Sequence, residues 1–284
     1  MTEKKYIDWK DDMARFEAYL REQESAEATV AKYLRDIRTF MTFAEGRTWI
    51  EKSDILRYKD WLMENYSVNS ANSMIVALNQ FLIFMEAGRM RVRRIRVQAQ
   101  GFRSGEKELC KEEFRRLVCQ ARTSGRPQIA MIMETICATG IRVSELKFFQ
   151  ADNVKTGAVR VWNKGKYRIV LIPDKLRRKL LAYMAKYGIK SGPLFRTRSG
   201  RAKDRSNIWR EMKELAGEAG VDAGKVFPHN LRHLFARTFY RVTKNLLHLA
   251  DILGHSSLEV TRIYACDGIS ECRKSLERLE LIDG

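Results

Sequence analysis

The sequence has few prolines and no long apolar run. Four prolines in 284 residues exclude a proline-rich, disordered composition, and 45% hydrophobic residues suffice for packed cores. No apolar stretch approaches the ~20 residues that a membrane-spanning helix requires. The opening MTEKKYIDWKDDM lacks the apolar segment of a signal peptide. We therefore expect a globular, cytoplasmic protein of two domains that has no membrane partner.

Cysteine is scarce, and several common catalytic signatures are missing. The five cysteines are odd in number and form no C-x-x-C pair, which argues against a zinc site or a disulfide framework. The sequence also lacks a P-loop and an H-E-x-x-H motif. We expect chemistry that needs neither a metal ion nor any other cofactor. The cysteines are Cys110, Cys119, Cys137, Cys266 and Cys272.

Acidic residues are outnumbered. The chain has 53 Lys and Arg against 35 Asp and Glu, a net charge of +18. Residues 1–100 hold 17 basic and 15 acidic side chains (+2), which leaves 36 and 20 (+16) for residues 101–284. Such a field attracts polyanions, and nucleic acid is the usual partner. A role in solubility or at an anionic membrane is the alternative.

The first hundred residues are predicted to be helical. Apolar residues recur at helical spacing in residues 25–46 and 70–88, and each segment ends at a glycine. Lys32, Arg35 and Arg38 repeat every three residues, so they share one face of the first of these helices. That face either binds DNA or is simply solvated.

A basic stretch separates this region from the rest of the chain. Residues 89–107, RMRVRRIRVQAQGFRSGEK, show weak periodicity and are interpreted as an interdomain segment that can follow a phosphate backbone. We place the linker at residues 98–107, between a first domain at 1–97 and a catalytic domain at 108–284. The candidate DNA-binding residues of the basic stretch are Arg93, Arg94 and Arg96.

The second segment is predicted to be helical around one β-hairpin. GAVRVWNKG and KYRIVLIP are rich in Val and Ile and are separated by a lysine- and glycine-containing turn. That turn carries Lys164 and Lys166. The fold class is therefore mainly α with a small β-hairpin. The other side chains here that can do chemistry are Arg142, Glu145, His229, Arg232, His255 and Tyr264.

These residue types suit reaction at a phosphodiester. Arginine grips phosphate oxygens in a fork and keeps its proton, so two arginines can neutralise transition-state charge. A phenol with a pKa of about 10 is only ~0.1% ionised at pH 7, so a tyrosine nucleophile needs a proton acceptor and a positive field. Histidine can supply the first and arginine the second, while lysine can protonate a leaving oxygen.

Four motifs occur in order: ATGIRVSEL, NKGK, HNLRH and LGHSSLEVTRIY. Together they resemble the tyrosine recombinase and phage integrase family, especially its two-domain Xer-like members. The resemblance covers about residues 108–270, and SAEATVAKYLRDIRTF resembles the start of the family's helical core-binding domain. It implies a SAM-like core-binding domain and a catalytic domain that form a C-shaped clamp on DNA.

The resemblance also implies roles for the residues. Tyr264 attacks the scissile phosphate and leaves a 3′-phosphotyrosyl link and a free 5′-hydroxyl, without metal or ATP. Arg142 and Arg232 clamp the non-bridging oxygens. Lys164 is the general acid for the 5′-oxygen, and His229 helps to move the tyrosine proton. This chemistry passes through a Holliday junction when two duplexes recombine.

Further roles follow from the same resemblance. His255 hydrogen-bonds the phosphate, and Glu145 orients its neighbours. Lys166 is the alternative to Lys164 as general acid and otherwise contacts DNA. A short terminal helix after Tyr264 docks either on a neighbouring protomer or on its own.

The expected protein is a site-specific recombinase that acts as a homo-tetramer on double-stranded DNA. Short inverted-repeat core sites are the expected substrate, at the nucleoid, and the sequence leaves accessory proteins open. It also leaves open integration, excision, inversion or dimer resolution. The alternatives are a type IB topoisomerase and a non-catalytic DNA-binding protein on the same fold.

Overall fold

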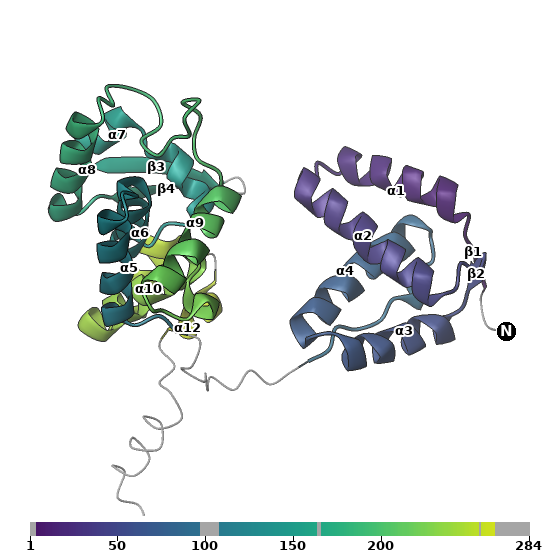
Figure 1. Ribbon diagram of the computed structural model, residues 1–284. Coiled ribbons are helices and arrows are strands. Elements are labelled where there is room, and N and C mark those ends of the chain that lie inside the picture. Colours follow the sequence, from purple (N-terminus) through teal and green to yellow (C-terminus); the bar gives the residue numbers. More distant parts are fainter. Residues whose placement is uncertain (1–3, 97–107, 164–165, 256, 265–284) are drawn as a thin grey trace, which may run out of the picture. The chain divides into compact units, whose positions relative to one another are not determined.

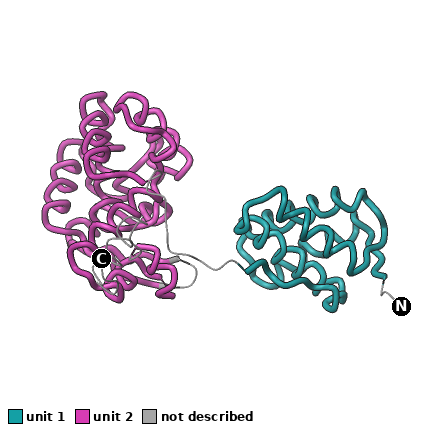
Figure 2. The backbone as a smooth tube through the Cα atoms, turned by 90° about the horizontal axis from the view of Figure 1, so that it is seen from below, with its two compact units in different colours: residues 1–99 teal, residues 100–284 magenta. Residues whose placement is uncertain are grey.

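Two compact units make up the chain. The computed structural model describes residues 4–96, 108–163, 166–255 and 257–264. The boundary between the units lies after Ala99 (Figure 2). Each unit has its own buried hydrophobic cluster, so each is described separately.

Some predicted features lie outside the described residues. These are the linker at 98–107, the candidate general acid Lys164 and the terminal helix expected after Tyr264. The backbone of Lys166 is described as the first residue of a strand, but its side chain is not. The structure therefore leaves the choice between the two lysines as a prediction.

The first unit is mainly helical, as predicted (Figure 1). Aromatic side chains fill its centre: Phe16 and Phe81 meet edge to face at 5.2 Å, and Trp9 packs on Phe40 at 6.0 Å. Asp8 caps the first helix by accepting backbone N–H groups. The elements are β1 (Lys5–Tyr6), α1 (Trp9–Glu22), α2 (Glu27–Phe43), β2 (Trp49–Ile50), α3 (Lys52–Asn65), α4 (Val68–Phe84) and η1 (Gly88–Met90).

The end of the unit differs from the sequence expectation. Helix α4 stops before Gly88, and Glu86 takes the left-handed conformation instead, with φ of 56°. The chain beyond η1 then packs on α4, because Asn79 hydrogen-bonds both the N–H and the carbonyl of Val92. Asn72 holds Ile95 in the same way. The part of the basic stretch before residue 97 is thus fastened to the first unit.

The second unit is also mainly helical and contains the predicted hairpin. Strands β3 and β4 pair antiparallel from Ala158–Leu171 to Asn163–Lys166, which confirms that prediction. The elements are α5 (Lys111–Thr123), α6 (Pro127–Thr139), η3 (Val143–Phe148), α7 (Ala151–Thr156), β3 (Ala158–Asn163), β4 (Lys166–Leu171), α8 (Asp174–Lys186), α9 (Arg205–Glu218), η4 (Ala223–Lys225), α10 (Pro228–Thr243), α11 (Leu246–Leu253) and α12 (Leu258–Arg262).

Helix α6 forms the centre of this unit. Its residues Ile129, Ile132 and Ile136 are fully buried, as its nearly all-apolar sequence predicts. It packs against α5 and α10 (Figure 1). Gly140 ends the helix in the left-handed conformation. The centre of the fold thus positions the chain that follows α6 beside α10.

The helices of the described residues are all too short or too polar to cross a bilayer.

Candidate functional site

Tyr264 lies at the end of the described chain and is almost fully buried. Only 6% of its surface is exposed. Its ring lies 5.1 Å from the ring of His233 and 6.4 Å from that of His255, nearly parallel to the latter. The short helix α12 ends two residues earlier and delivers the tyrosine to this position. The predicted nucleophile therefore lies among histidines.

Arg232 is the most deeply buried cation of the site, with 1% of its surface exposed. Its guanidinium donates to the carbonyl of Gly140 at 2.7 Å, to that of Leu253 at 2.8 Å and to Nε2 of His255 at 3.0 Å. Burial, together with the charge of nearby Arg142, lowers the pKa of Arg232 to about 10. The side chain remains charged at neutral pH, and these bonds use three of its five N–H groups.

His255 joins Arg232 to the segment that carries the tyrosine. Its Nδ1 lies 2.8 Å from the hydroxyl of Thr261, which is fully buried. Because an arginine can only donate, Nε2 of His255 must accept and Nδ1 must carry the proton. Burial, reinforced by the charges of Arg232 and Arg142, lowers the pKa of His255 to about 4. His255 is therefore neutral at pH 7 and orients the guanidinium of Arg232.

Gly254, which precedes this histidine, ends a helix. In the structure, Gly254 is the left-handed C-cap of α11, and His255 lies between two helices. Gly140 likewise ends α6, and Arg142 then caps the 3-10 helix η3.

The side chains of Arg142 and Glu145 form an ion pair. The carboxylate of Glu145 is buried and accepts the backbone N–H of Arg142 at 2.8 Å and Nη1 of Arg142 at 3.1 Å. About a third of the Arg142 side chain is exposed. This arrangement fixes the arginine at its backbone and at its head, and it leaves other N–H groups for an anion.

Arg168 on strand β4 belongs to the site but was not predicted from the sequence. Its Nη2 lies 2.6 Å from Oε2 of Glu145, and its Nη1 donates to the carbonyl of Ile252 at 2.8 Å. The available signal was strand alternation: Ile169 and Leu171 are exposed, whereas Val170 is buried on the same face as Arg168. An arginine on the inner face of a strand requires a partner.

His229 and His233 lie one turn apart on α10. Their rings meet edge to face at 4.4 Å, and that of His233 lies between those of His229 and Tyr264. The resemblance to the family gave His229 the role in proton movement. In the structure His229 is exposed in the first turn of α10, and the buried His233 contacts the tyrosine ring directly.

The predicted DNA-contacting residues of the first unit lie in different settings. Lys32 forms an ion pair with Asp36 on its own helix. Arg35 and Arg38 are exposed and line a hollow of about 400 Å³, together with Trp61. The remaining three predicted contacts, in the segment fastened to α4, have exposed side chains: Arg93, Arg94 and Arg96.

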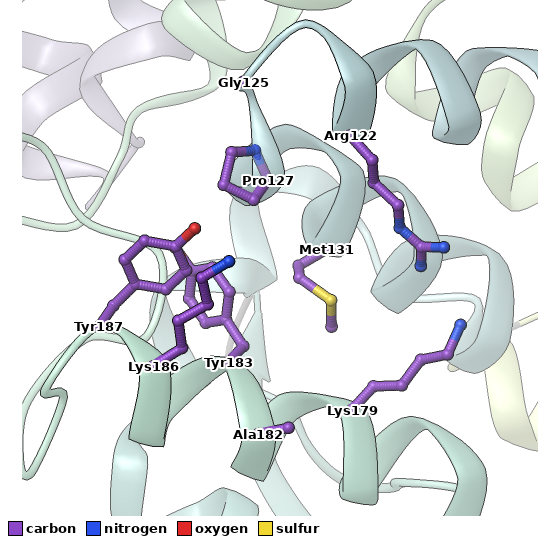
Figure 3. A pocket seen from close by; sticks show the side chains of 9 residues that line it. All are labelled: Arg122, Gly125, Pro127, Met131, Lys179, Ala182, Tyr183, Lys186 and Tyr187. Atoms are coloured by element: carbon purple, nitrogen blue, oxygen red, sulfur yellow. The ribbon is translucent and has the colours of Figure 1, made fainter.

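A larger hollow of about 620 Å³ lies between α8 and the chain that joins α5 to α6 (Figure 3). Tyr183 and Tyr187 line one side of it. At the other side, Glu134 accepts hydrogen bonds from both Arg122 and Lys179. These two cations are thus already paired within the fold, and the hollow contains none of the predicted catalytic residues.

Metal-ligand chemistry was not expected for this chain. Across the described ranges, no three His, Cys, Asp or Glu side chains gather closely enough to hold a metal ion.

Arg232 and Arg142, with histidines and Tyr264 beside them, form a positive site that can neutralise charge on a reacting phosphoryl group. A family profile described as "Phage integrase family" matches residues 107–268, and one described as "Phage integrase, N-terminal SAM-like domain" matches residues 13–87. The chain belongs to the phage integrase family.

Relatives match nearly the whole chain. The tyrosine recombinase XerA of Thermococcus kodakarensis is 29% identical over 280 residues, which is 94% of this chain and 95% of the relative. The tyrosine recombinase XerD of Vibrio cholerae is 26% identical over 266 residues, 86% of this chain and 87% of the relative.

Solved structures share the fold. A lambda integrase dimer bound to a COC′ core site has a TM-score of 0.71 at 17% identity, and the match covers 91% of this chain and 95% of that one. A pre-cleavage complex of the recombinase XerH with its difH substrate has a TM-score of 0.63 at 18% identity, over 89% of this chain and 79% of that one. The mainly helical fold with a small hairpin is therefore as predicted.

Proposed function

We propose that this protein is a site-specific DNA recombinase that cuts and rejoins strands through a covalent bond between Tyr264 and DNA. The observation that carries the proposal is the burial of Tyr264 beside His255, which itself accepts a hydrogen bond from the buried Arg232. Relatives that match nearly the full chain are named tyrosine recombinases, which favours recombination over relaxation of supercoils.

In the proposed reaction, the phenolic oxygen of Tyr264 attacks the scissile phosphorus. The bond from phosphorus to that oxygen forms, and the bond from phosphorus to the 5′-oxygen breaks. The phenol gives up its proton with the help of the His229 imidazole, and the leaving 5′-oxygen takes a proton from Lys164. Arg142 and Arg232 neutralise the charge on the non-bridging oxygens. A second 5′-hydroxyl reverses these steps and rejoins the strands.

His255 has a conditional role in this scheme. With Nε2 accepting from Arg232, the imidazole orients the arginine and cannot donate to phosphate. Burial and, after it, the charges of Arg232 and Arg142 hold the pKa of His255 at about 4, and a bound phosphate offsets the contribution of the arginines. We propose that DNA raises this pKa, so that the imidazole can then donate to a phosphate oxygen.

The proposed substrate is double-stranded DNA with short inverted repeats, bound by four protomers. A lambda integrase tetramer bound to a Holliday junction shares this fold, with a TM-score of 0.70. Arg35, Arg38 and the exposed arginines after η1 are the proposed contacts of the first unit. The excess of basic residues in 101–284 attracts the phosphate backbone of the same DNA.

The test is covalent capture. Wild type, Tyr264→Phe and the control Tyr187→Phe are incubated with end-labelled, nicked duplexes from the flanks of the gene, with chelator present. After denaturation, we expect protein attached to a 3′ end with wild type and the control, and none with Tyr264→Phe. An adduct that persists in Tyr264→Phe would overturn the assignment of the nucleophile.

A further inference from the structure

Arg168 connects three parts of the site that lie far apart in the sequence. It belongs to the hairpin strand β4, it pairs with Glu145 of η3, and it donates to the carbonyl of Ile252 in α11. Only 14% of its side chain is exposed. An exposed arginine would contribute little through such contacts, whereas a buried one fixes the positions of its partners.

Gly254 shows how closely Arg168 approaches the chain before His255. A Cβ atom added at Gly254 would lie 2.5 Å from Cδ and 2.7 Å from Nε of Arg168. The glycine also has φ of 63°. Any other residue at position 254 would displace the side chain of Arg168. The position of this side chain and the backbone conformation just before His255 therefore depend on each other.

The carboxylate of Glu145 is divided between two arginines. Oε2 accepts from Arg168 and from the backbone N–H of Arg142, and Oε1 accepts from Nη1 of Arg142. Without Arg168, the full charge of this buried carboxylate would act on Arg142 alone. Arg142 would then turn toward both oxygens in the usual forked geometry, and its N–H groups would turn away from a bound phosphate.

We propose that Arg168 is a positioning residue for strand cleavage, which keeps Arg142 aimed at the scissile phosphate by occupying one oxygen of Glu145. This role rests on the proposed recombinase function. Arg168 does not itself touch DNA in this scheme. It acts through Glu145 on Arg142, and through the end of α11 on the segment that begins with His255.

The experiment measures single-turnover cleavage of nicked duplexes at saturating protein by wild type, Arg168→Met and the control Arg160→Met. Arg160 lies exposed on the paired strand β3 of the same hairpin. Because a small misplacement of a catalytic group can cost 10²-fold, we expect Arg168→Met to be about tenfold to a hundredfold slower. Arg160→Met should cleave at the wild-type rate, and DNA affinity should hardly change in Arg168→Met.

Two altered substrates separate positioning from general damage. A methylphosphonate at the scissile position carries no charge for the arginines to neutralise, whereas a bridging 5′-phosphorothiolate has a leaving group that needs no proton. We expect the Arg168→Met defect to shrink several-fold on the methylphosphonate and to persist on the phosphorothiolate. An equal defect on all three substrates would refute the role, and so would rescue by the phosphorothiolate alone.

Folding and function are controlled separately. If Arg168→Met unfolds, Arg168→Gln, which also removes the positive partner of Glu145, is compared on the same substrates. A defect that shrinks on the methylphosphonate supports the proposal, and wild-type cleavage by Arg168→Gln overturns it. A wild-type protein that forms no adduct with any of these DNAs refutes the recombinase function itself, and with it this role.

Discussion

Replacing Gly140 by alanine should damage both the stability of the second unit and its cleavage activity. Gly140 ends α6 with φ of 66° and lies two residues before Arg142. A Cβ atom there would lie 2.4 Å from Cδ1 and 2.5 Å from Cε1 of Phe235, and 3.0 Å from Leu253. The carbonyl of Gly140 also accepts a hydrogen bond from Arg232.

The expected magnitude has two parts. A left-handed conformation costs a non-glycine residue roughly 1–2 kcal/mol. Forcing a methyl group against the ring of Phe235 in a packed core costs typically about 1–3 kcal/mol more. We therefore expect Gly140→Ala to lower the free energy of unfolding by about 2–5 kcal/mol. Relief of the clash would shift the carbonyl that anchors Arg232, so cleavage should fall by at least about tenfold.

Gly125 provides a matched control, because it has a similar φ of 71° but no atom within 4 Å of an added Cβ. Gly125→Ala should therefore cost only the conformational part, roughly 1–2 kcal/mol. Since two units need not unfold together, hydrogen exchange of α6 and α10 peptides across a urea series is the suitable assay. Cleavage by Gly125→Ala should match wild type.

The difference between the two variants isolates the contact with Phe235. A pair of variants with equal stability would show that the approach of Gly140 to Phe235 is wrong. Normal cleavage by a clearly destabilised Gly140→Ala would show that the end of α6 does not influence the phosphate site. It would refute the proposed anchoring of Arg232 by the carbonyl of Gly140.

Three further outcomes are expected. Thr261→Val should remove the partner of His255 Nδ1 and slow cleavage several-fold, whereas ¹⁵N NMR should still find the proton on Nδ1, because Arg232 continues to donate to Nε2. A proton found on Nε2 would contradict this. The pKa of His255 is about 4 in the folded protein and 6.5 at its ordinary value, so the unfolded chain takes up this proton at a higher pH than the folded chain. The free energy of unfolding should therefore be unaffected by this group above pH 6.5 and should fall between pH 6.5 and pH 4. Urea titrations of His255→Gln should lack this part of the pH dependence. Asn79→Leu should expose the Val92 segment to faster hydrogen exchange and leave cleavage of saturated DNA unchanged.

Much of the fold follows from local pattern. The helices over residues 25–46 and 70–88 appear as α2 and α4, because helical spacing of apolar residues reports which face will be buried. The hairpin was also predicted, since two Val- and Ile-rich runs flanked a turn. The helix ends were less accurate: Glu86, not Gly88, takes the left-handed conformation after α4.

The order and spacing of the motifs, which predicted family membership, are likewise local information. They point to the candidate site residues as a set. They do not reveal how these residues are held, because that depends on contacts between distant segments. Arg168 meets Ile252 across 84 positions, and Arg232 meets Gly140 across 92.

Individual properties within the site also required the tertiary structure. Burial beside Arg232 and Arg142 lowers the pKa of His255, and the hydrogen bond from Arg232 decides which imidazole nitrogen carries the proton. The place of His233 beside Tyr264 depends on where α12 meets α10. Sequence shows which chemical groups are present, but only packing sets their distances, their shared charges and the water removed around them, and these quantities control protonation and orientation.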